Sequence, residues 1–268
     1  MADLARRRST VIRSVRYEML LRNKNAIVYG AGGIGRAVAL GFAREGAKVH
    51  LASRTPKRLD AVAEEIRSAG GTVATAQLDA LDEAAVGAHA DAVATESGSI
   101  DISINLISVG DVQGTPLAEM SLRHFEQPIH IAVRTTFLTS KAAARHMIRQ
   151  RSGVLLTFGG VGDPLRDYFI GGFQIALGAV DTLRKQLAAE LGPYGIRVVG
   201  LKTGGVPETL PEDYKGREAL VESLVKPTML GRTATLEDVG SVAAFAASDR
   251  AGSITGSELN ITCGAIVD

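Results

Sequence analysis

The chain has very little cysteine and few aromatic side chains. Cys263 is the only cysteine among 268 residues, which excludes an intrachain disulfide and a metal site built from several cysteines. A single thiol fits a reducing compartment, so we expect a cytoplasmic protein. Tryptophan is absent and aromatic residues make up 4% of the chain, which argues against a surface built to stack nucleic-acid bases.

Charge of one sign and long apolar runs are also lacking. The formal net charge is +1, so no bulk electrostatic field points to nucleic acid as a partner. No run of eighteen apolar residues occurs, so we expect no membrane-spanning segment. With one cysteine in the chain, we also expect no metal site. What is present is a chain that is 46% hydrophobic and contains 30 glycines, long enough for one large α/β domain with a full core.

The most informative stretch is a cluster of glycines between two apolar segments. Residues 26–28 form a short apolar run that predicts a buried strand, and residues 37–42 have the apolar spacing of a helix. Gly30, Gly32 and Gly35 lie between them and match the pattern G-x-G-x-x-G. Strand, glycine turn and helix in this order are the context of a dinucleotide-binding loop.

Such a turn suits a dinucleotide for steric and electrostatic reasons. The N–H groups in the first turn of a helix bind a pyrophosphate only where no Cβ holds it away, and glycine allows the positive φ values of a tight turn. We therefore predict a cofactor site at Gly30, Gly32, Gly33, Ile34 and Gly35. The alternative is a turn that only lets helix and strand pack closely, but four glycines in six residues exceed what that requires.

The end of the second expected strand, residues 48–52, predicts which dinucleotide is bound. Ser53 and Arg54 follow this strand, and a helix is expected over residues 56–69. An acid at this point would accept a hydrogen bond from the adenosine ribose, whereas a guanidinium would bind a 2′-phosphate. We interpret Ser53 and Arg54 as a preference for NADP(H). The alternative is a solvated basic helix start, which the helix dipole disfavours.

The rest of the chain alternates between strand and helix patterns. Further strands are expected at 72–78, 100–105, 154–158, 196–201 and 257–262, and helices at 82–96, 121–150, 173–191 and 235–247. Pro128 is expected to bend or break the first turns of its helix. This alternation predicts a single-domain α/β fold of the Rossmann type, a doubly wound parallel sheet with helices on both faces.

Three other segments have distinct patterns. Residues 1–18 are basic and form either a functional arm or a solvated or partner-packed extension that precedes the domain at 19–268. Residues 205–230 contain three prolines and no clean periodicity, which predicts a loop with short helices that acts as a substrate lid. Residues 235–238 resemble a capping box at the start of the last helix.

Residues 19–268 resemble the short-chain dehydrogenase/reductase family. The segments that carry the resemblance are 27–37, 78–80, 100–102, 188–198, 230–239 and 247–256. The resemblance implies a nicotinamide cofactor and a small-molecule substrate. It also implies further cofactor-binding residues, namely Asp79, Ala80, Asn105, Leu106, Ile107, Thr203, Gly204 and Val206.

The resemblance also implies assembly as a homotetramer or homodimer. In the family, the helices that correspond to residues 121–150 and 171–192 pair between subunits. We expect exposed faces of these helices to carry small residues that permit close approach. The residues in question are Ala142, Ala143, Ala144, Ala188 and Ala189.

The departures from the family pattern concern both the cofactor loop and the catalytic groups. The glycine loop is one residue shorter than the family's, and the family's Asn-Asn-Ala-Gly is replaced by residues 105–108, Asn-Leu-Ile-Ser. The family's catalytic Asn, Ser, Tyr and Lys fall on Ala132, Gly160, Phe173 and Leu177.

The missing tyrosine matters most for the chemistry. In the family it exchanges the proton at a carbonyl oxygen, and a positioned acid of this kind contributes roughly 10²–10⁴ in rate. A phenylalanine has no such proton, so ordinary ketone or alcohol chemistry is not expected. The nearest acid–base candidates are Tyr168, Asp163 and Asp167 after the fifth strand and Lys202 at the end of the sixth. For each, the alternative is a solvated loop residue.

Three functions fit this sequence. The first is an NADPH-dependent oxidoreductase that transfers hydride to a C=N or activated C=C bond, since a protonated imine needs no further acid. The second is an NADP(H)-binding pseudoenzyme or partner subunit without catalysis. The third is a non-redox isomerase or cyclase, for which the sequence offers no positive support. We favour the first because the glycine loop, Ser53, Arg54 and the lid region are all retained.

Overall fold

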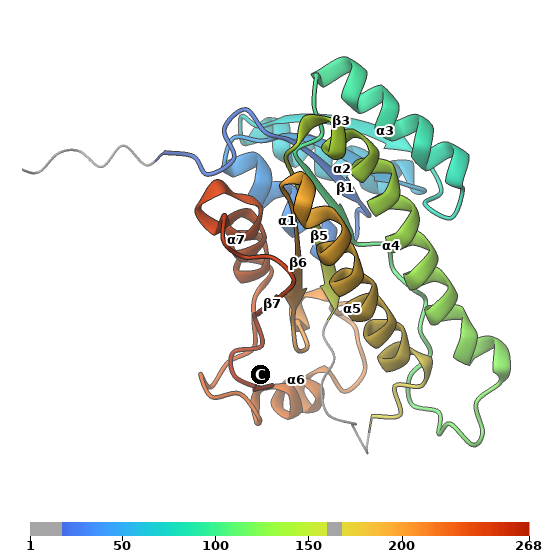
Figure 1. Cartoon of the computed structure of the whole chain (residues 1–268). Coiled ribbons are helices and arrows are strands. Elements are labelled where there is room, and N and C mark those ends of the chain that lie inside the picture. The colour runs from blue at the N-terminus through green and yellow to red at the C-terminus, as the bar shows by residue number, and fades with distance from the viewer. Residues whose placement is uncertain (1–17, 160–167, 268) are drawn as a thin grey trace, which may run out of the picture.

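Seven parallel strands form one continuous sheet in the order β3-β2-β1-β4-β5-β6-β7 (Figure 1). The computed structural model describes residues 18–159 and 168–267. The strands are β1 (Asn25–Tyr29), β2 (Lys48–Ser53), β3 (Thr72–Gln77), β4 (Ile102–Asn105), β5 (Gly153–Gly159), β6 (Ile196–Lys202) and β7 (Glu258–Asn260). The chain proceeds outward from β1 to β3 and then returns to place β4 on the other side of β1. A crevice therefore forms at the carboxyl ends of β1 and β4.

Helices cover both faces of the sheet (Figure 1). One face packs against α1 (Gly33–Arg44), α2 (Pro56–Ser68) and α7 (Leu236–Ala247), and the other against α3 (Glu83–Ser97), α4 (Leu122–Gln150) and α5 (Gly172–Leu191). The short helix α6 (Arg217–Val225) lies beyond the carboxyl end of the sheet. The predicted single-domain, doubly wound α/β fold is confirmed.

The central strand β1 shows why the core divides into two layers. Its side chains alternate, so Ala26 and Val28 join the core under α1, α2 and α7, whereas Ile27 and Tyr29 join the core under α3, α4 and α5. All four side chains are fully buried. A strand buried on both faces reads as a continuous apolar run, which is the pattern that the sequence has at this point.

The expected break at Pro128 is wrong, because α4 runs without interruption from Leu122 to Gln150. A proline near the start of a helix removes one backbone hydrogen bond. The ring packs closely against α5, since a Cβ added to Gly172 would lie 3.2 Å from Cγ of Pro128. The buried ring thus occupies a place where two helices approach closely, and the helix continues through it.

The expectation that Ala142, Ala143 and Ala144 lie on an exposed face is also wrong. Their side chains are 0–6% exposed and belong to the core between α4 and the sheet. Ala188 is half-buried and Ala189 is exposed on α5. The small residues of α4 therefore serve packing within the chain, and they give no support to a subunit interface.

The segment 205–230 contains a short 3-10 helix, η3 (Pro207–Thr209), followed by α6. The guanidinium of Arg217 donates hydrogen bonds to the carbonyl oxygens of Pro207, Leu210 and Pro211 at 3.1–3.2 Å, which ties the segment together. Two further 3-10 turns, Gly192–Tyr194 and Asp249–Ala251, precede β6 and follow α7. Within the described part of the chain, no helix combines the length and apolarity needed to cross a membrane.

Candidate active site

The glycine turn after β1 is closed by two glycines that have no room for a side chain. Gly30 has a φ of +113°, and a Cβ there would collide with the carbonyl oxygen of Leu106 at the end of β4. A Cβ on Gly35 would collide with the carbonyl oxygen of Gly30. These two positions let β1, β4 and α1 meet at one point.

Gly32 and Gly33 have a different environment, because they face the crevice. A Cβ on Gly32 would meet no atom within 4 Å. Gly32 is also the N-cap of α1, and it provides no side-chain cap, while the first turn of the helix contains no acidic residue. The N–H groups of that turn and the positive end of the helix dipole are thus available to an anion. This bare cradle fits the diphosphate of a dinucleotide.

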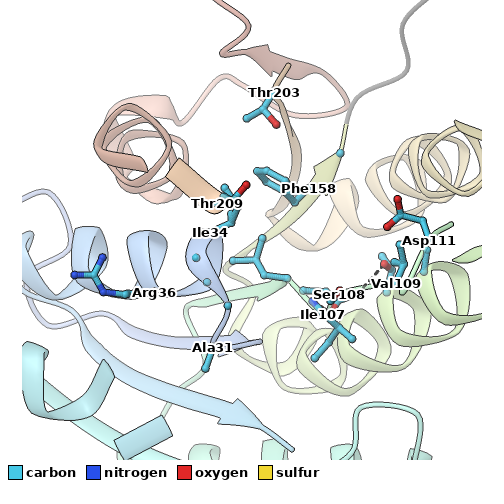
Figure 2. A pocket seen from close by; sticks show the side chains of 18 of the residues that line it. Ala31, Ile34, Arg36, Ile107, Ser108, Val109, Asp111, Phe158, Thr203 and Thr209 are labelled. Carbon is cyan, nitrogen blue, oxygen red and sulfur yellow. Dashed lines mark hydrogen bonds between the residues drawn. The ribbon is translucent and has the colours of Figure 1, made fainter. Parts of the chain in front are cut away.

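The crevice is a cleft of about 810 Å³ at the carboxyl end of the sheet (Figure 2). Its walls come from the glycine turn, α2, the segment after β4, α4, the end of β5, α5, the end of β6 and η3. Nine of the predicted cofactor residues line it: Gly32, Gly33, Ile34, Gly35, Asn105, Leu106, Ile107, Thr203 and Gly204. The structure thus brings together residues that are far apart in the sequence, from Gly32 to Gly204, as the sheet order leads one to expect.

The predicted residues at the adenosine end lie beside the cleft and not among the residues that line it. The carboxylate of Asp79 is 3.9 Å from Nη1 of Arg54, and both side chains are exposed. The Ser53 hydroxyl is buried and accepts a hydrogen bond from the N–H of Thr55 at 3.3 Å. Arg54 and Asp79 are thereby placed together at the carboxyl ends of β2 and β3.

Three predicted cofactor residues remain: Gly30, which closes the turn and does not line the cleft, and Ala80 and Val206, which are core residues. Ala80 is 1% exposed and packs in the layer under α3, and Val206 is 7% exposed and packs in the layer under α1.

Sequence reasoning missed an ion pair at the glycine end of the cleft. Nε of Arg36 donates to both carboxylate oxygens of Glu65 on α2, at 2.8 and 2.9 Å. These hydrogen bonds raise the pKa of Arg36 and lower the pKa of Glu65. Arg58 lines the cleft on the same helix. Arg36 directly follows the last glycine of the motif. This position next to the glycine turn is the sequence feature that could have indicated a charged side chain at this end of the cleft.

Sequence reasoning also missed the contact between η3 and the glycine turn. A Cβ on Gly33 would lie 3.4 Å from Cγ2 of Thr209, so η3 lies against the start of α1. Figure 2 shows Thr209 next to Ile34 at the mouth of the cleft. The segment predicted as a lid therefore contributes one wall of the cleft.

The opposite part of the cleft is apolar where the family resemblance places catalytic groups. Ala132, Phe173 and Leu177 all line the cleft, together with Phe158 and Val180. None of these side chains can donate or accept a proton. The fourth position, Gly160, lies outside the described residues.

Asn105 at the end of β4 is held by α4. Its Nδ2 donates hydrogen bonds to Oγ1 of Thr135 at 2.8 Å and of Thr136 at 3.0 Å. Its Oδ1 accepts a hydrogen bond from the N–H of Ile107 at 3.3 Å. The side chain is thus used to fix the turn after β4, which positions Leu106 and Ile107 in the cleft.

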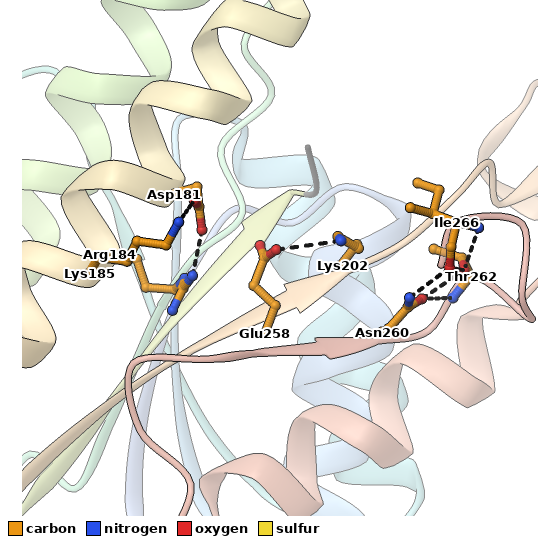
Figure 3. A network of polar contacts seen from close by, with 8 residues as sticks. All are labelled: Asp181, Arg184, Lys185, Lys202, Glu258, Asn260, Thr262 and Ile266. Carbon is orange, nitrogen blue, oxygen red and sulfur yellow. Dashed lines mark hydrogen bonds and ion pairs between the residues drawn. The ribbon is translucent and has the colours of Figure 1, made fainter. Parts of the chain in front are cut away.

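The proposed acid–base residues that the structure describes do not line the cleft. The hydroxyl of Tyr168 donates to Oγ of Ser223 on α6 at 3.0 Å. Lys202 is 6% exposed, and its Nζ is 3.8 Å from a carboxylate oxygen of Glu258 on β7 (Figure 3). Asp163 and Asp167 lie outside the described residues. The structure therefore does not assemble these groups with Phe173 at one reacting point.

Comparison with known proteins identifies the class. A family model described as Enoyl-(Acyl carrier protein) reductase matches residues 30–265. The chain is 31% identical over 246 residues to the uncharacterized oxidoreductase YxbG of Bacillus subtilis, with 89% of each chain covered. It is 31% identical over 248 residues to gluconate 5-dehydrogenase of Gluconobacter oxydans, covering 92% of this chain and 96% of the relative.

Solved structures agree with this assignment. A short-chain dehydrogenase/reductase from Serratia marcescens superposes with a TM-score of 0.81 at 28% identity, covering 92% of this chain and 99% of the other. A short-chain type dehydrogenase/reductase from Mycobacterium ulcerans gives a TM-score of 0.83 at 25% identity, covering 91% and 90%. The chain belongs to the short-chain dehydrogenase/reductase family, whose members are oxidoreductases that use a nicotinamide cofactor.

Proposed function

We propose that the protein is an NADPH-dependent reductase that transfers a hydride to a C=N or activated C=C bond of a small organic molecule. The observation that carries the proposal is the composition of the cleft. One end is an uncapped helix start with a bare glycine, and the other is an apolar wall that contains Phe173 and Leu177. The first feature suits a dinucleotide, and the second suits a reaction that needs no proton from the protein.

Particular residues would hold the cofactor. The N–H groups at Gly32, Gly33 and Gly35 would bind the diphosphate. The exposed guanidinium of Arg54, beside Asp79, would bind a 2′-phosphate and thereby favour NADPH over NADH. When bound, the reduced nicotinamide supplies a hydride. The protein's part is to orient the acceptor and to exclude water through the apolar wall.

The choice of acceptor follows from the missing acid. Reduction of a neutral carbonyl leaves an alkoxide that must be protonated, and the residues at positions 132, 173 and 177 have no proton to give. A protonated imine carries its own proton on nitrogen. An activated C=C bond yields an enolate that solvent protonates. Reduction of either acceptor therefore needs no proton donor in the apolar wall.

A binding titration followed by a turnover assay tests the proposal. We expect NADPH to bind at least about tenfold more tightly than NADH by calorimetry, and Arg54→Glu to abolish that preference. We then expect NADPH oxidation with a cyclic iminium salt or an enone, and none with the matching ketone. Failure of wild-type protein to bind either dinucleotide would contradict the proposal.

A second candidate is an NADP(H)-binding pseudoenzyme or partner subunit. It is favoured by the same apolar wall, because three of the four family catalytic positions in the cleft carry no titratable side chain. The two candidates differ in one result. Tight NADPH binding without turnover of any acceptor in the panel supports the pseudoenzyme, and turnover by the pure protein excludes it.

Two further proposals concern the organisation of the chain. We propose that residues 205–230 act as the lid of the cleft, which is supported by the packing of Thr209 against the glycine turn and by the three carbonyl contacts of Arg217. We also retain the prediction that the protein forms a homotetramer or homodimer and that residues 1–18 are an extension of the domain.

A further inference from the structure

The charged residues of the cleft are distributed unevenly. Among the described residues that line it, only Arg36, Arg58, Glu65 and Asp111 carry a formal charge. The first three belong to α1 and α2 at the glycine end, where Arg36 and Glu65 pair with each other. Figure 2 shows Arg36 and Asp111 at opposite ends of the cleft. Among the described residues, the end away from the glycine turn therefore has one charge, and it is negative.

The position of Asp111 is set by hydrogen bonds on both sides. The preceding residue, Gly110, has a φ of +64°, and its carbonyl oxygen accepts a hydrogen bond from Nε2 of Gln127 on α4 at 2.9 Å. The N–H of Gly114 donates to the carbonyl oxygen of Phe169 at 3.1 Å. The segment that carries Asp111 is thus tied to α4 and to the residues that precede α5.

One oxygen of the Asp111 carboxylate has no hydrogen-bond donor among the described residues and is left for a ligand. Nε2 of Gln113 donates to Oδ2 at 2.6 Å, and no other described residue donates to this carboxylate. No lysine, arginine or histidine of the described chain lies within ion-pair distance of it. Within the described part of the chain, this half-buried carboxylate has no cationic partner, and it lines the same cleft as the apolar wall. A carboxylate in such surroundings attracts a cation more strongly than one in open solvent.

The neighbouring residues favour the same kind of ligand. Phe158 and Phe173 line the cleft with Asp111, and the faces of aromatic rings attract cations. We propose that the substrate is a cation, an iminium ion with an aromatic or aliphatic body, and that Asp111 is its counter-ion. This inference rests on the proposed reductase function and selects the C=N acceptor from the two named there.

The reaction then balances without a proton donor from the protein. The iminium carbon receives the hydride, the π pair of the C=N bond becomes the lone pair of nitrogen, and NADPH is oxidised to NADP⁺. The product is a neutral amine. The negative charge of Asp111 stabilises the protonated imine against loss of its proton before hydride transfer, so Asp111 acts as a specificity-determining residue.

The test uses a pair of inert probes of equal size. Protonated 2-phenylethylamine and neutral 2-phenylethanol are titrated by calorimetry into wild-type protein with saturating NADP⁺. We expect the cation to bind about tenfold more tightly than the alcohol. Asp111→Asn should reduce this ratio to about one while leaving the affinity for the alcohol unchanged. Asp60→Asn, which removes an exposed carboxylate from α2, is the control and should keep the wild-type ratio.

Two results would overturn the inference. One is equal affinity of the wild-type protein for the two probes, a measurement that needs no variant. The other is an unchanged ratio in Asp111→Asn when its thermal unfolding matches that of wild type. If enones are reduced while the probes bind equally, the reductase function stands and only this inference fails. If neither dinucleotide binds, the proposed function itself fails.

Discussion

At the scale of single residues, the glycines of the turn have two separable roles. Gly30 and Gly35 are required because a Cβ would collide with a backbone carbonyl. Gly32 has open space around its missing Cβ, and its φ of −78° and ψ of −174° are accessible to alanine. Gly30 and Gly35 thus permit the close backbone packing of the turn, and Gly32 leaves space for the dinucleotide that we propose.

This separation gives a prediction with an internal control. Gly32→Ala should leave the Tm within about 2 °C of wild type but weaken NADPH binding by about tenfold or more, because the Cβ enters the phosphate cradle. Gly35→Ala should lower the free energy of unfolding by about 2 kcal/mol or more, since the backbone must move. Thermal unfolding and NADPH calorimetry on both variants check this. Equal loss of stability in the two variants would contradict it.

Phe173 and Leu177 allow a test of the acid that the cleft lacks. The double variant Phe173→Tyr with Leu177→Lys introduces a phenol and an ammonium group at two positions that line the cleft. We expect ketone reduction to rise about tenfold above background, the lower part of the range for a positioned acid, because the other family groups are still missing. NADPH consumption with a ketone measures it. Phe173→Leu with Leu177→Lys is the control that lacks the phenol and should show no rise.

At the scale of elements, α7 illustrates a local signal that the structure confirms. Thr235 accepts a hydrogen bond from the N–H of Asp238 at 3.0 Å, and the Asp238 carboxylate accepts one from the N–H of Thr235 at 2.9 Å. The nearby Arg232 guanidinium and these hydrogen bonds hold the pKa of Asp238 below its usual range. The two residues that form this capping box, Thr235 and Asp238, lie within one helical turn of each other in the sequence, so the motif could be predicted.

The cap makes a measurable contribution to stability. Thr235→Ala removes one of the two reciprocal hydrogen bonds, and we expect a loss of about 1 kcal/mol in the free energy of unfolding, or about 2–4 °C in Tm. Thr235→Ser keeps the hydroxyl and should behave as wild type. Urea unfolding of the three proteins measures the difference. A loss in the serine variant equal to that in the alanine variant would mean that the hydroxyl is not what matters.

At the scale of the whole molecule, a polar cluster lies between the sheet and α3. His50 on β2 is 3% exposed, and its Nε2 is 3.1 Å from Oγ of Ser97, to which Lys48 also donates at 3.0 Å. Burial, together with the charges of Lys48 and His89, lowers the pKa of His50 to about 4. Burial also lowers the pKa of His89, whose Nδ1 is 3.4 Å from the hydroxyl of Tyr29.

This cluster predicts loss of stability on acidification. The unfolded chain takes up a proton at His50 near pH 6.5, whereas the folded protein resists uptake until about pH 4. The free energy of unfolding therefore decreases as the pH falls from 6.5 to 4, and His50 does not affect stability above that range. We expect the fall in Tm from pH 7.5 to pH 5 to be about 3 °C larger in wild type than in His50→Gln. Identical pH profiles of the two proteins would contradict the role of His50.

The assembly of the protein is a separate question at this scale. The alanines of α4 are inside the core, but Phe137 of α4 and Ile175 of α5 are 46% and 47% exposed. Apolar side chains exposed on these helices are consistent with the subunit contact that we propose. We expect light scattering to give the mass of a dimer or tetramer, and Phe137→Lys to lower it. A monomer mass for wild type would contradict the proposal.

The order of elements, the glycine turn and the cap of α7 could all be predicted from the amino-acid sequence. Each of these depends on residues within about ten positions of one another, whose periodicity and conformational limits act locally. The order of elements then restricted the topology, because parallel strands need crossover helices of one hand. The family was predicted from the resemblance of several short segments, and the comparisons confirm it.

Which polar side chains contact one another could not be predicted from the sequence and depends on how the elements pack. Glu65 on α2 pairs with Arg36 on α1. Asp111 lines the same cleft as residues of β5 and α5. The side chain of Ala142 is buried in the core, which the sequence of its long helix did not indicate. The same holds for Tyr168 and Lys202, which contact Ser223 and Glu258 from other elements. Such contacts depend on the packing of segments far apart in the chain, and no local pattern specifies the resulting distances.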